Sequence, residues 1–177
     1  MVASARKGSR RATQSSREAP PMDNDVIDLL TEDHRKVEEM FEEYESSKDE
    51  ADDETKSALV ATICLELTMH ASVEEEIFYP AARGALDEED SDMLDEAEVE
   101  HASVKVLIAD LADMQPSDAL YDAKVKVLSE YVKHHVQEEE GEIFPSVRES
   151  EIDLASLGEE VASRKQELMD EYQSSQD

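Results

Sequence analysis

The stretch His70-Ala-Ser-Val-Glu74-Glu-Glu-Ile-Phe-Tyr-Pro80 places a histidine and a glutamate inside a helical apolar pattern. A related stretch, His135-Val-Gln-Glu-Glu139-Glu-Gly-Glu-Ile-Phe-Pro145, occurs later in the chain. In both, a glutamate follows the histidine by four residues, and an apolar residue, an aromatic residue and a proline follow at eight, nine and ten. A spacing of four puts imidazole and carboxylate on one helical face. The repeat therefore predicts two helices that each give one histidine and one glutamate to a shared metal site.

Two further predicted helices each have one histidine in an apolar stripe. His34 lies in a helix predicted from about residue 23 to 44, and His101 lies in one predicted over about 88 to 114. The repeated stretches lie in helices predicted over about 53 to 82 and from about 117 to 145. As caps we expect Asp23 or Asn24 for the first helix and Ser117 for the fourth.

The composition and the short connections predict one all-α domain. The chain has 4 Gly, 5 Pro and no Trp in 177 residues, which favours helices over strands. Short connections make consecutive helices antiparallel neighbours, so we expect an up-down-up-down four-helix bundle over residues 22–148. An amphipathic pattern over residues 153–173 predicts an extra C-terminal helix, within a segment 149–177 that packs on the bundle or meets a partner. Residues 1–21 show no apolar periodicity, and we expect a disordered basic tail.

The charge of the chain limits its partners. The formal net charge is -30, from 47 acidic and 17 basic residues, and such a body repels nucleic acid and anionic membranes. Adaptation to a salt-rich cytoplasm is a second reading of the same charge. The chain has one cysteine, no apolar run long enough to span a membrane and no export signal, so we expect a cytoplasmic protein.

Four histidines at one depth of a core predict a metal rather than ordinary packing. Counted from the predicted turns, His70, His101 and His135 lie at similar levels, with a looser match for His34. Imidazoles meeting in a core would be poorly compensated without a bound group. With the two glutamates they give six nitrogen and oxygen ligands, which suit iron, or manganese as the alternative, rather than tetrahedral zinc. The predicted ligands are His34, His70, Glu74, His101, His135 and Glu139.

These residues resemble the hemerythrin-like HHE cation-binding family over about residues 23 to 147. The likeness rests on Asp33-His34, His70-x-x-x-Glu74, Glu100-His101 and His135-x-x-x-Glu139 with its trailing Ile-Phe-Pro. The resemblance implies an up-down four-helix bundle with two non-haem iron ions, bridged by carboxylates and an oxo or hydroxo group. It also implies binding of O2, or sensing of iron, O2 or redox state; some members are linked to peroxide or nitric oxide chemistry.

The resemblance departs from oxygen-carrying hemerythrins at Lys105, where they have a second histidine. We expect one iron to have fewer imidazoles, with Tyr131 or Lys105 as candidates to serve the site. For Tyr131, plain packing in the core is the favoured reading. The leading hypothesis is a di-iron protein that binds O2 or a related small molecule, or that senses or buffers iron or redox state. The alternative is a di-iron redox enzyme acting on peroxide or nitric oxide. A structural bundle with carboxylate-paired histidines is a third reading.

Overall fold

The computed structural model describes residues 25–175, apart from the side chains of residues 88–90. The predicted tail over residues 1–21 and the predicted caps Asp23 and Asn24 lie outside these residues. The helical elements in chain order are α1 (Val26–Ser47), α2 (Asp53–Val73), η1 (Glu74–Phe78), α3 (Tyr79–Arg83), α4 (Glu88–Ala112), α5 (Tyr121–Glu138), η2 (Glu139–Ile143), α6 (Phe144–Glu149) and α7 (Leu154–Ser175).

The first two helices begin at aspartate caps, because a side-chain carboxylate satisfies a backbone N–H that has no partner within the helix. Asp25 accepts from the backbone N–H of Asp28 at 3.0 Å, and Asp52 accepts from that of Thr55 at 2.8 Å. The prediction for α5 was wrong: this helix begins at Tyr121 without a side-chain cap, and Ser117 lies in the preceding turn.

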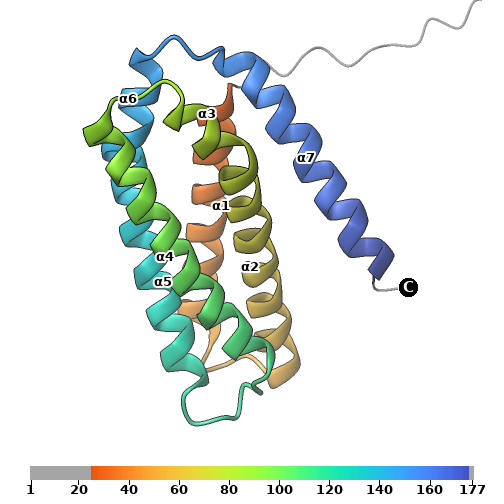
Figure 1. The fold of residues 1–177 in the computed structure, drawn as a ribbon. Coiled ribbons are helices and arrows are strands. Elements are labelled where there is room, and N and C mark those ends of the chain that lie inside the picture. Colours follow the sequence, from red (N-terminus) through yellow and green to blue (C-terminus); the bar gives the residue numbers. More distant parts are fainter. Residues whose placement is uncertain (1–24, 176–177) are drawn as a thin grey trace, which may run out of the picture.

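Four long helices form an up-down-up-down bundle, and α7 lies across the outer side of α1 and α2 (Figure 1). The buried side chains Leu157 and Val161 fix α7 to the bundle. Two cations from α7 add ion pairs to the same face: Lys165 pairs with Asp33, and Arg164 pairs with Glu76. The predicted all-α bundle with an extra C-terminal helix is confirmed. No helix within residues 25–175 combines the length and the apolar character that a membrane span requires.

The hydrophobic core is divided into two clusters by a layer of polar side chains. One cluster contains Leu30, Val73 and Ala97, and the other contains Val37 and Leu67 with residues of α4 and α5. Along α1, His34 lies between Leu30 and Val37, so the histidine marks the boundary between the clusters. The predicted histidines therefore meet at one level, with apolar packing above and below them.

A wide π-helical turn follows each of the repeated His–Glu pairs, where a continuous α-helix was predicted. The N–H of Tyr79 donates to the carbonyl of Glu74, and that of Phe144 donates to the carbonyl of Glu139. This i→i+5 hydrogen bonding brings residues five apart onto the same side of the helix, as π-turns at functional sites commonly do. The glutamate and the aromatic residue of each stretch are therefore all buried.

Candidate metal centre

The structure brings all six predicted ligands together in the buried layer of the bundle. His34 comes from α1, His70 from α2, His101 from α4 and His135 from α5, while the two glutamates begin the π-turns η1 and η2. Each histidine is at most 7% exposed, and Glu74 and Glu139 are 0% exposed. The ligand atoms form two groups that could each hold an ion. One group is His34, His70, Glu74 and Glu139, and the other is Glu74, His101 and His135.

Glu74 spans the two groups with its two carboxylate oxygens. Its Oε1 lies 3.1 Å from Nε2 of His70, and its Oε2 lies 3.4 Å from Nε2 of His101. The Nε2 atoms of His34 and His70 are 3.1 Å apart, as are those of His101 and His135. Glu74 therefore reaches both groups, and each group contains two imidazoles.

Glu139 approaches both groups through one oxygen. Its Oε2 lies 3.2 Å from Nε2 of His34 and 3.4 Å from that of His135. This oxygen and both oxygens of Glu74 are buried without a hydrogen-bond partner. Such groups are rare in folded proteins, because an unpaired buried carboxylate oxygen loses its hydration without compensation. Three oxygens that converge on four imidazole nitrogens fit a pair of metal ions.

A carboxylate outside the ligand set holds each imidazole by its other nitrogen. Nδ1 of His34 lies 2.9 Å from Glu140, and Nδ1 of His101 lies 3.0 Å from Glu75. The remaining two pairs are His70 with Asp33 at 3.2 Å and His135 with Glu100 at 2.9 Å. A carboxylate at Nδ1 keeps the proton on that nitrogen and leaves the Nε2 lone pair for a metal.

These four carboxylates were not predicted as part of the site. Each of them is the sequence neighbour of a predicted ligand, as in Asp33-His34 and Glu139-Glu140. Each reaches a ligand on a different helix: Asp33 of α1 holds His70 of α2, for example. The signal that could have found them is this adjacency, which occurs at four of the six predicted ligands.

The electrostatics of the layer favour positive charge. Burial would lower the pKa of His70, but Glu74 and Asp33 outweigh burial and raise the pKa to about 10. Burial opposes protonation of His135 too, yet Glu139 and Glu100 raise its pKa to about 11. Burial acts to raise the pKa of Glu139, and the neighbouring His135 and His34 hold it well below its ordinary value. Without a metal, protons on the imidazoles compensate the buried carboxylates.

The fifth residue after Glu74 differs from the fifth residue after Glu139: the first is Tyr79 and the second is Phe144. Tyr79 stacks on His101 with ring centroids 5.6 Å apart, and Phe144 stacks on His34 at 5.7 Å. The Tyr79 hydroxyl donates to Oε1 of Glu139 at 2.9 Å and lies 3.5 Å from Nε2 of His101. Burial and the nearby Glu74 and Glu139 raise its pKa, so the hydroxyl keeps its proton. Sequence reasoning missed Tyr79, although the aromatic position of the repeat marked it.

The two other side chains that we considered for the site lie outside it. Tyr131 is 48% exposed on α5, so it neither reaches the centre nor packs in the core, and both predictions for it were wrong. Lys105 lies 2.6 Å from both oxygens of Glu75 and so reaches the carboxylate that holds His101, not the ligand layer. The choice between adjacent histidines agrees with burial: His135 is buried, whereas the side chain of His134 is 61% exposed.

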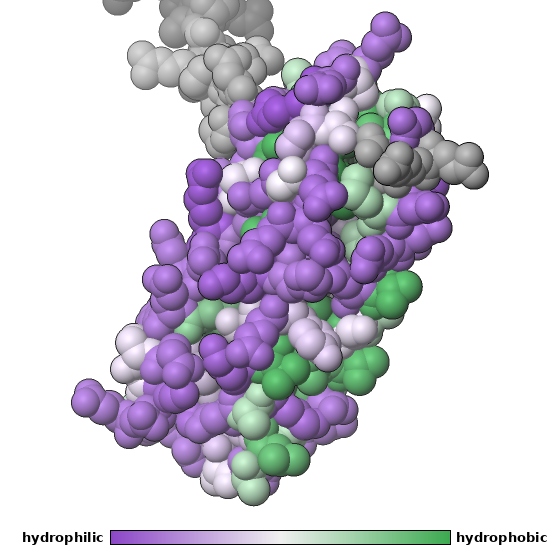
Figure 2. Space-filling view, turned by 90° about the vertical axis from the view of Figure 1, so that its left-hand side faces the viewer, coloured by the Kyte–Doolittle hydropathy of each residue, from purple (hydrophilic) through white to green (hydrophobic). Residues whose placement is uncertain are grey.

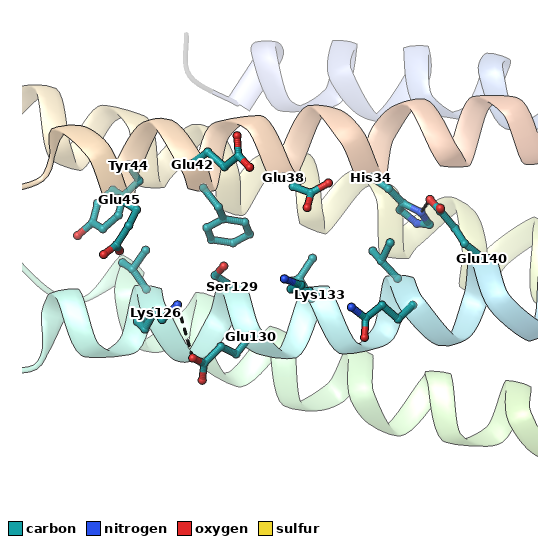
Figure 3. Close-up of a pocket in the computed structure, with 15 residues that line it drawn as sticks. His34, Glu38, Glu42, Tyr44, Glu45, Lys126, Ser129, Glu130, Lys133 and Glu140 are labelled. Carbon is teal, nitrogen blue, oxygen red and sulfur yellow. Dashed lines mark hydrogen bonds and ion pairs between the residues drawn. The ribbon is translucent and has the colours of Figure 1, made fainter.

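Two cavities give the centre room and access. A small cavity of about 20 Å³ lies against all four imidazoles, with an otherwise largely apolar lining that includes Val37, Leu67, Val104 and Val132. A groove of about 420 Å³ lies between α1 and α5 and reaches His34 and Glu140 at one end (Figure 3). Val132 and Val136 line both spaces. His34, Val132 and Val136 therefore form the wall between the groove and the small cavity.

The fold and the site together define a helical-bundle protein with histidine and glutamate groups able to hold metal. The chain belongs to the hemerythrin HHE cation binding domain family, whose model matches residues 25–147. This confirms the resemblance inferred from the sequence. The assignment of the six ligands themselves stays a prediction.

Individual relatives agree with this membership. A protein named DNA nickase from Nostoc sp. is 30% identical over 126 residues, which cover 71% of this chain and 34% of that protein. A hemerythrin-like protein of Schizosaccharomyces pombe is 27% identical over 120 residues, which cover 68% of this chain and 58% of that protein. The chain thus spans from about a third to somewhat over half of the length of these relatives.

A solved structure has the same fold. The crystal structure of a hemerythrin HHE cation binding domain-containing protein from Mycobacterium kansasii superposes with a TM-score of 0.68. The match has 23% sequence identity and covers 82% of this chain and 87% of that chain. At this identity the likeness supports the fold alone.

Proposed function

We propose that this chain holds two iron ions at His34, His70, Glu74, His101, His135 and Glu139, and binds O2 or a related small molecule there. The observation on which the proposal rests is the set of three buried carboxylate oxygens without a partner, facing four Nε2 atoms. Mixed nitrogen and oxygen ligation of this kind suits iron or manganese. Bound iron would supply one-electron and O2 chemistry.

The small cavity supports a small exogenous ligand. Its volume of about 20 Å³ exceeds the ~10–15 Å³ that one water-sized molecule needs. Its apolar lining excludes larger polar substrates and favours a diatomic molecule, since a polar one would lose hydration on entering. The same centre could sense iron or redox state, because a change in occupancy alters the charge of a layer that holds four helices together.

Metal analysis and absorption spectra test this proposal. We expect two iron ions per chain and a reversible spectral change when O2 is added to the reduced protein. In Glu74→Ala, loss of the residue that spans both groups should remove metal, whereas the matched exposed variant Glu39→Ala should keep it. Substantially fewer than two ions in the native chain after ferrous iron is added anaerobically would contradict the proposal.

A redox enzyme acting on peroxide or nitric oxide is the second candidate, and Tyr79 is the observation that favours it. Its hydroxyl lies beside both Glu139 and His101 and is inaccessible to solvent, with the residue 1% exposed. A buried hydroxyl at this position can hold or pass a proton at the Glu139 carboxylate. Steady turnover of peroxide by the native protein, and its loss in Tyr79→Phe with metal content unchanged, would select the enzyme over the binding protein.

We also propose that nucleic acid is not a partner of this chain. A formal net charge of -30 opposes the approach of phosphates, and the relative named DNA nickase has about two thirds of its length outside the matched region. A gel-shift assay at low ionic strength should show no complex with nicked or intact duplex DNA. A complex that salt dissociates would refute this expectation.

A further inference from the structure

A third cavity, with an acidic lining, lies on the outer side of the bundle. It has a volume of about 170 Å³ and lies between α4 and the α5–η2 segment. Four glutamates line it, namely Glu96, Glu100, Glu138 and Glu142, and its lining also includes His135 and Glu139 of the centre. Figure 2, which views this side of the molecule, shows hydrophilic side chains over most of the face. The cavity therefore joins an acidic surface to the buried layer.

The inner wall of this cavity includes Glu139, one of whose carboxylate oxygens has no hydrogen-bond partner. Glu139 is 0% exposed, and its Oε2 accepts no hydrogen bond. A cluster of surface glutamates alone is common in so acidic a chain. A fully buried glutamate that lines the cavity and has one oxygen without a hydrogen-bond partner is not, and it supports entry of a cation from this side.

Two glutamates of the cavity lining, Glu100 and Glu138, also contact a nitrogen donor outside the lining, His134. Nε2 of His134 lies 3.3 Å from Oε1 of Glu138 and 3.6 Å from Oε1 of Glu100. One ligand atom from each of these residues lies within 4.8 Å of the others, close enough to share one ion. The second oxygen of Glu100 lies 2.9 Å from Nδ1 of His135. Glu100 thus contacts both the outer group and a histidine of the centre.

The opposite side of the bundle shows why this feature is specific. Asp33 occupies on α1 the position that Glu100 occupies on α4, because each precedes a ligand histidine and holds the histidine of the following helix. Helix α7 covers that side, and Lys165 pairs with Asp33. Among residues 25–175, no lysine or arginine forms an ion pair with the four glutamates of the acidic cavity. Lys165 thus offsets the negative charge of Asp33 on the side of α1, whereas the side of α4 and α5 keeps the negative charge of its glutamates.

We propose that Glu100, His134 and Glu138 form an outer divalent-cation site through which metal reaches the centre. The inference requires that the centre binds metal, as proposed above, and is independent of which small molecule the centre then binds. A cation arriving from solvent is drawn to the four glutamates, is held by His134 and two carboxylates, and moves to the unpartnered oxygen of Glu139. A cavity of one charge sign raises local counter-ion concentration and association rates by about 10- to 1000-fold.

Cobalt(II) uptake by the metal-free full chain tests this proposal, because its absorption reports binding without redox chemistry. We expect Glu138→Gln to slow filling of the centre by about fivefold or more at low ionic strength, with the final content of the centre unchanged. His134→Ala should slow filling in the same way. Glu39→Gln on exposed α1 is the matched control for loss of one charge, and it should fill at the native rate.

A titration of the protein with a filled centre gives a second measurement. The native chain should bind one further cobalt ion more weakly, and both His134→Ala and Glu138→Gln should abolish this binding. Filling at the native rate in both variants would overturn the outer site while leaving the metal centre standing. A native chain that takes up no cobalt would overturn the centre and the outer site together.

Discussion

Replacing Tyr79 with phenylalanine removes a polar contact by which the two halves of the centre differ, because the equivalent residue in the other half is Phe144. The substitution keeps the ring that stacks on His101 and removes only the hydroxyl that donates to Oε1 of Glu139 at 2.9 Å. In the metal-free protein this oxygen would join the three buried oxygens that already lack a partner. The change therefore tests how much a single donor stabilises the ligand layer before metal arrives.

The expected loss follows from the charge and burial of the acceptor. A hydrogen bond to a charged group contributes about 1.5–3 kcal/mol to the free energy of unfolding. We expect Tyr79→Phe to lower the unfolding free energy of the metal-free protein by about 2 kcal/mol. The corresponding fall in Tm is roughly 4–8 °C for a domain of this size. Urea and thermal denaturation of metal-free native and variant protein measure both quantities.

The variant Phe144→Tyr provides the matched comparison, because Phe144 holds the equivalent position on the other half. Its new hydroxyl would lie on the side of Glu74, whose two oxygens have no hydrogen-bond partner. We expect unchanged or greater stability of the metal-free protein. If Tyr79→Phe proved as stable as the native chain within about 0.5 kcal/mol, the hydroxyl would not be stabilising Glu139 and this reasoning would be wrong.

Three further predictions concern metal, pH and the thiol. Glu139→Ala should lose metal and the stability that metal binding adds to the folded state. Glu138→Ala should retain both at equilibrium, and elemental analysis measures the difference. The reverse result would make His134 and Glu138, rather than His135 and Glu139, the ligands on this helix. The raised pKa values of His70 and His135, about 10 and about 11, lie above the unfolded value of 6.5. Their contribution to stability is therefore complete below pH 6.5 and is lost as pH rises through 10 to 11. Urea denaturation of the metal-free protein should show falling stability between pH 7 and 10, and a rise would refute the assignment. Burial raises the pKa of the Cys64 thiol to about 11. Alkylation of Cys64 at pH 8 should therefore be roughly a hundredfold slower than alkylation of an exposed thiol. Equal rates would show that local unfolding readily exposes this side chain.

The helices and the ligand layer could be predicted from the sequence because the apolar periodicity of the helices agrees with the spacing of the repeated His–Glu stretch. The three- and four-residue apolar steps define the helical faces, and histidines at those steps must point inward, as His34 and His101 do. The repeat that begins at His70 and at His135 then selects one glutamate among many acidic residues. Bulk composition could not have done this, because 47 of 177 residues are acidic.

The parts that could not be predicted depend on contacts between helices. Helix α5 begins at Tyr121, whereas the sequence predicted a start near Ser117. Packing of the buried Tyr121 in the core outweighs the preference for a serine cap. Tyr131 was assigned to the inner side by its one-turn distance from His135, but the inward positions of α5 are those of Leu128 and His135. The carboxylates at Nδ1 join different helices, and periodicity within one helix says nothing of such pairs.

The π-helical turns at Glu74 and Glu139 have a consequence for insertions and deletions. Each turn contains one more residue than an α-helical turn would, and the wider turn takes up that residue, so the helix after it stays nearly in phase with the helix before it. Deleting one residue within Glu74–Phe78 would give a regular α-helical turn in which Tyr79 follows Glu74 by four residues, and residues four apart lie on one helical face. A one-residue deletion there should therefore disturb the ligand layer less than one in the α-helical part of α2, where each lost residue turns everything after it through about 100°.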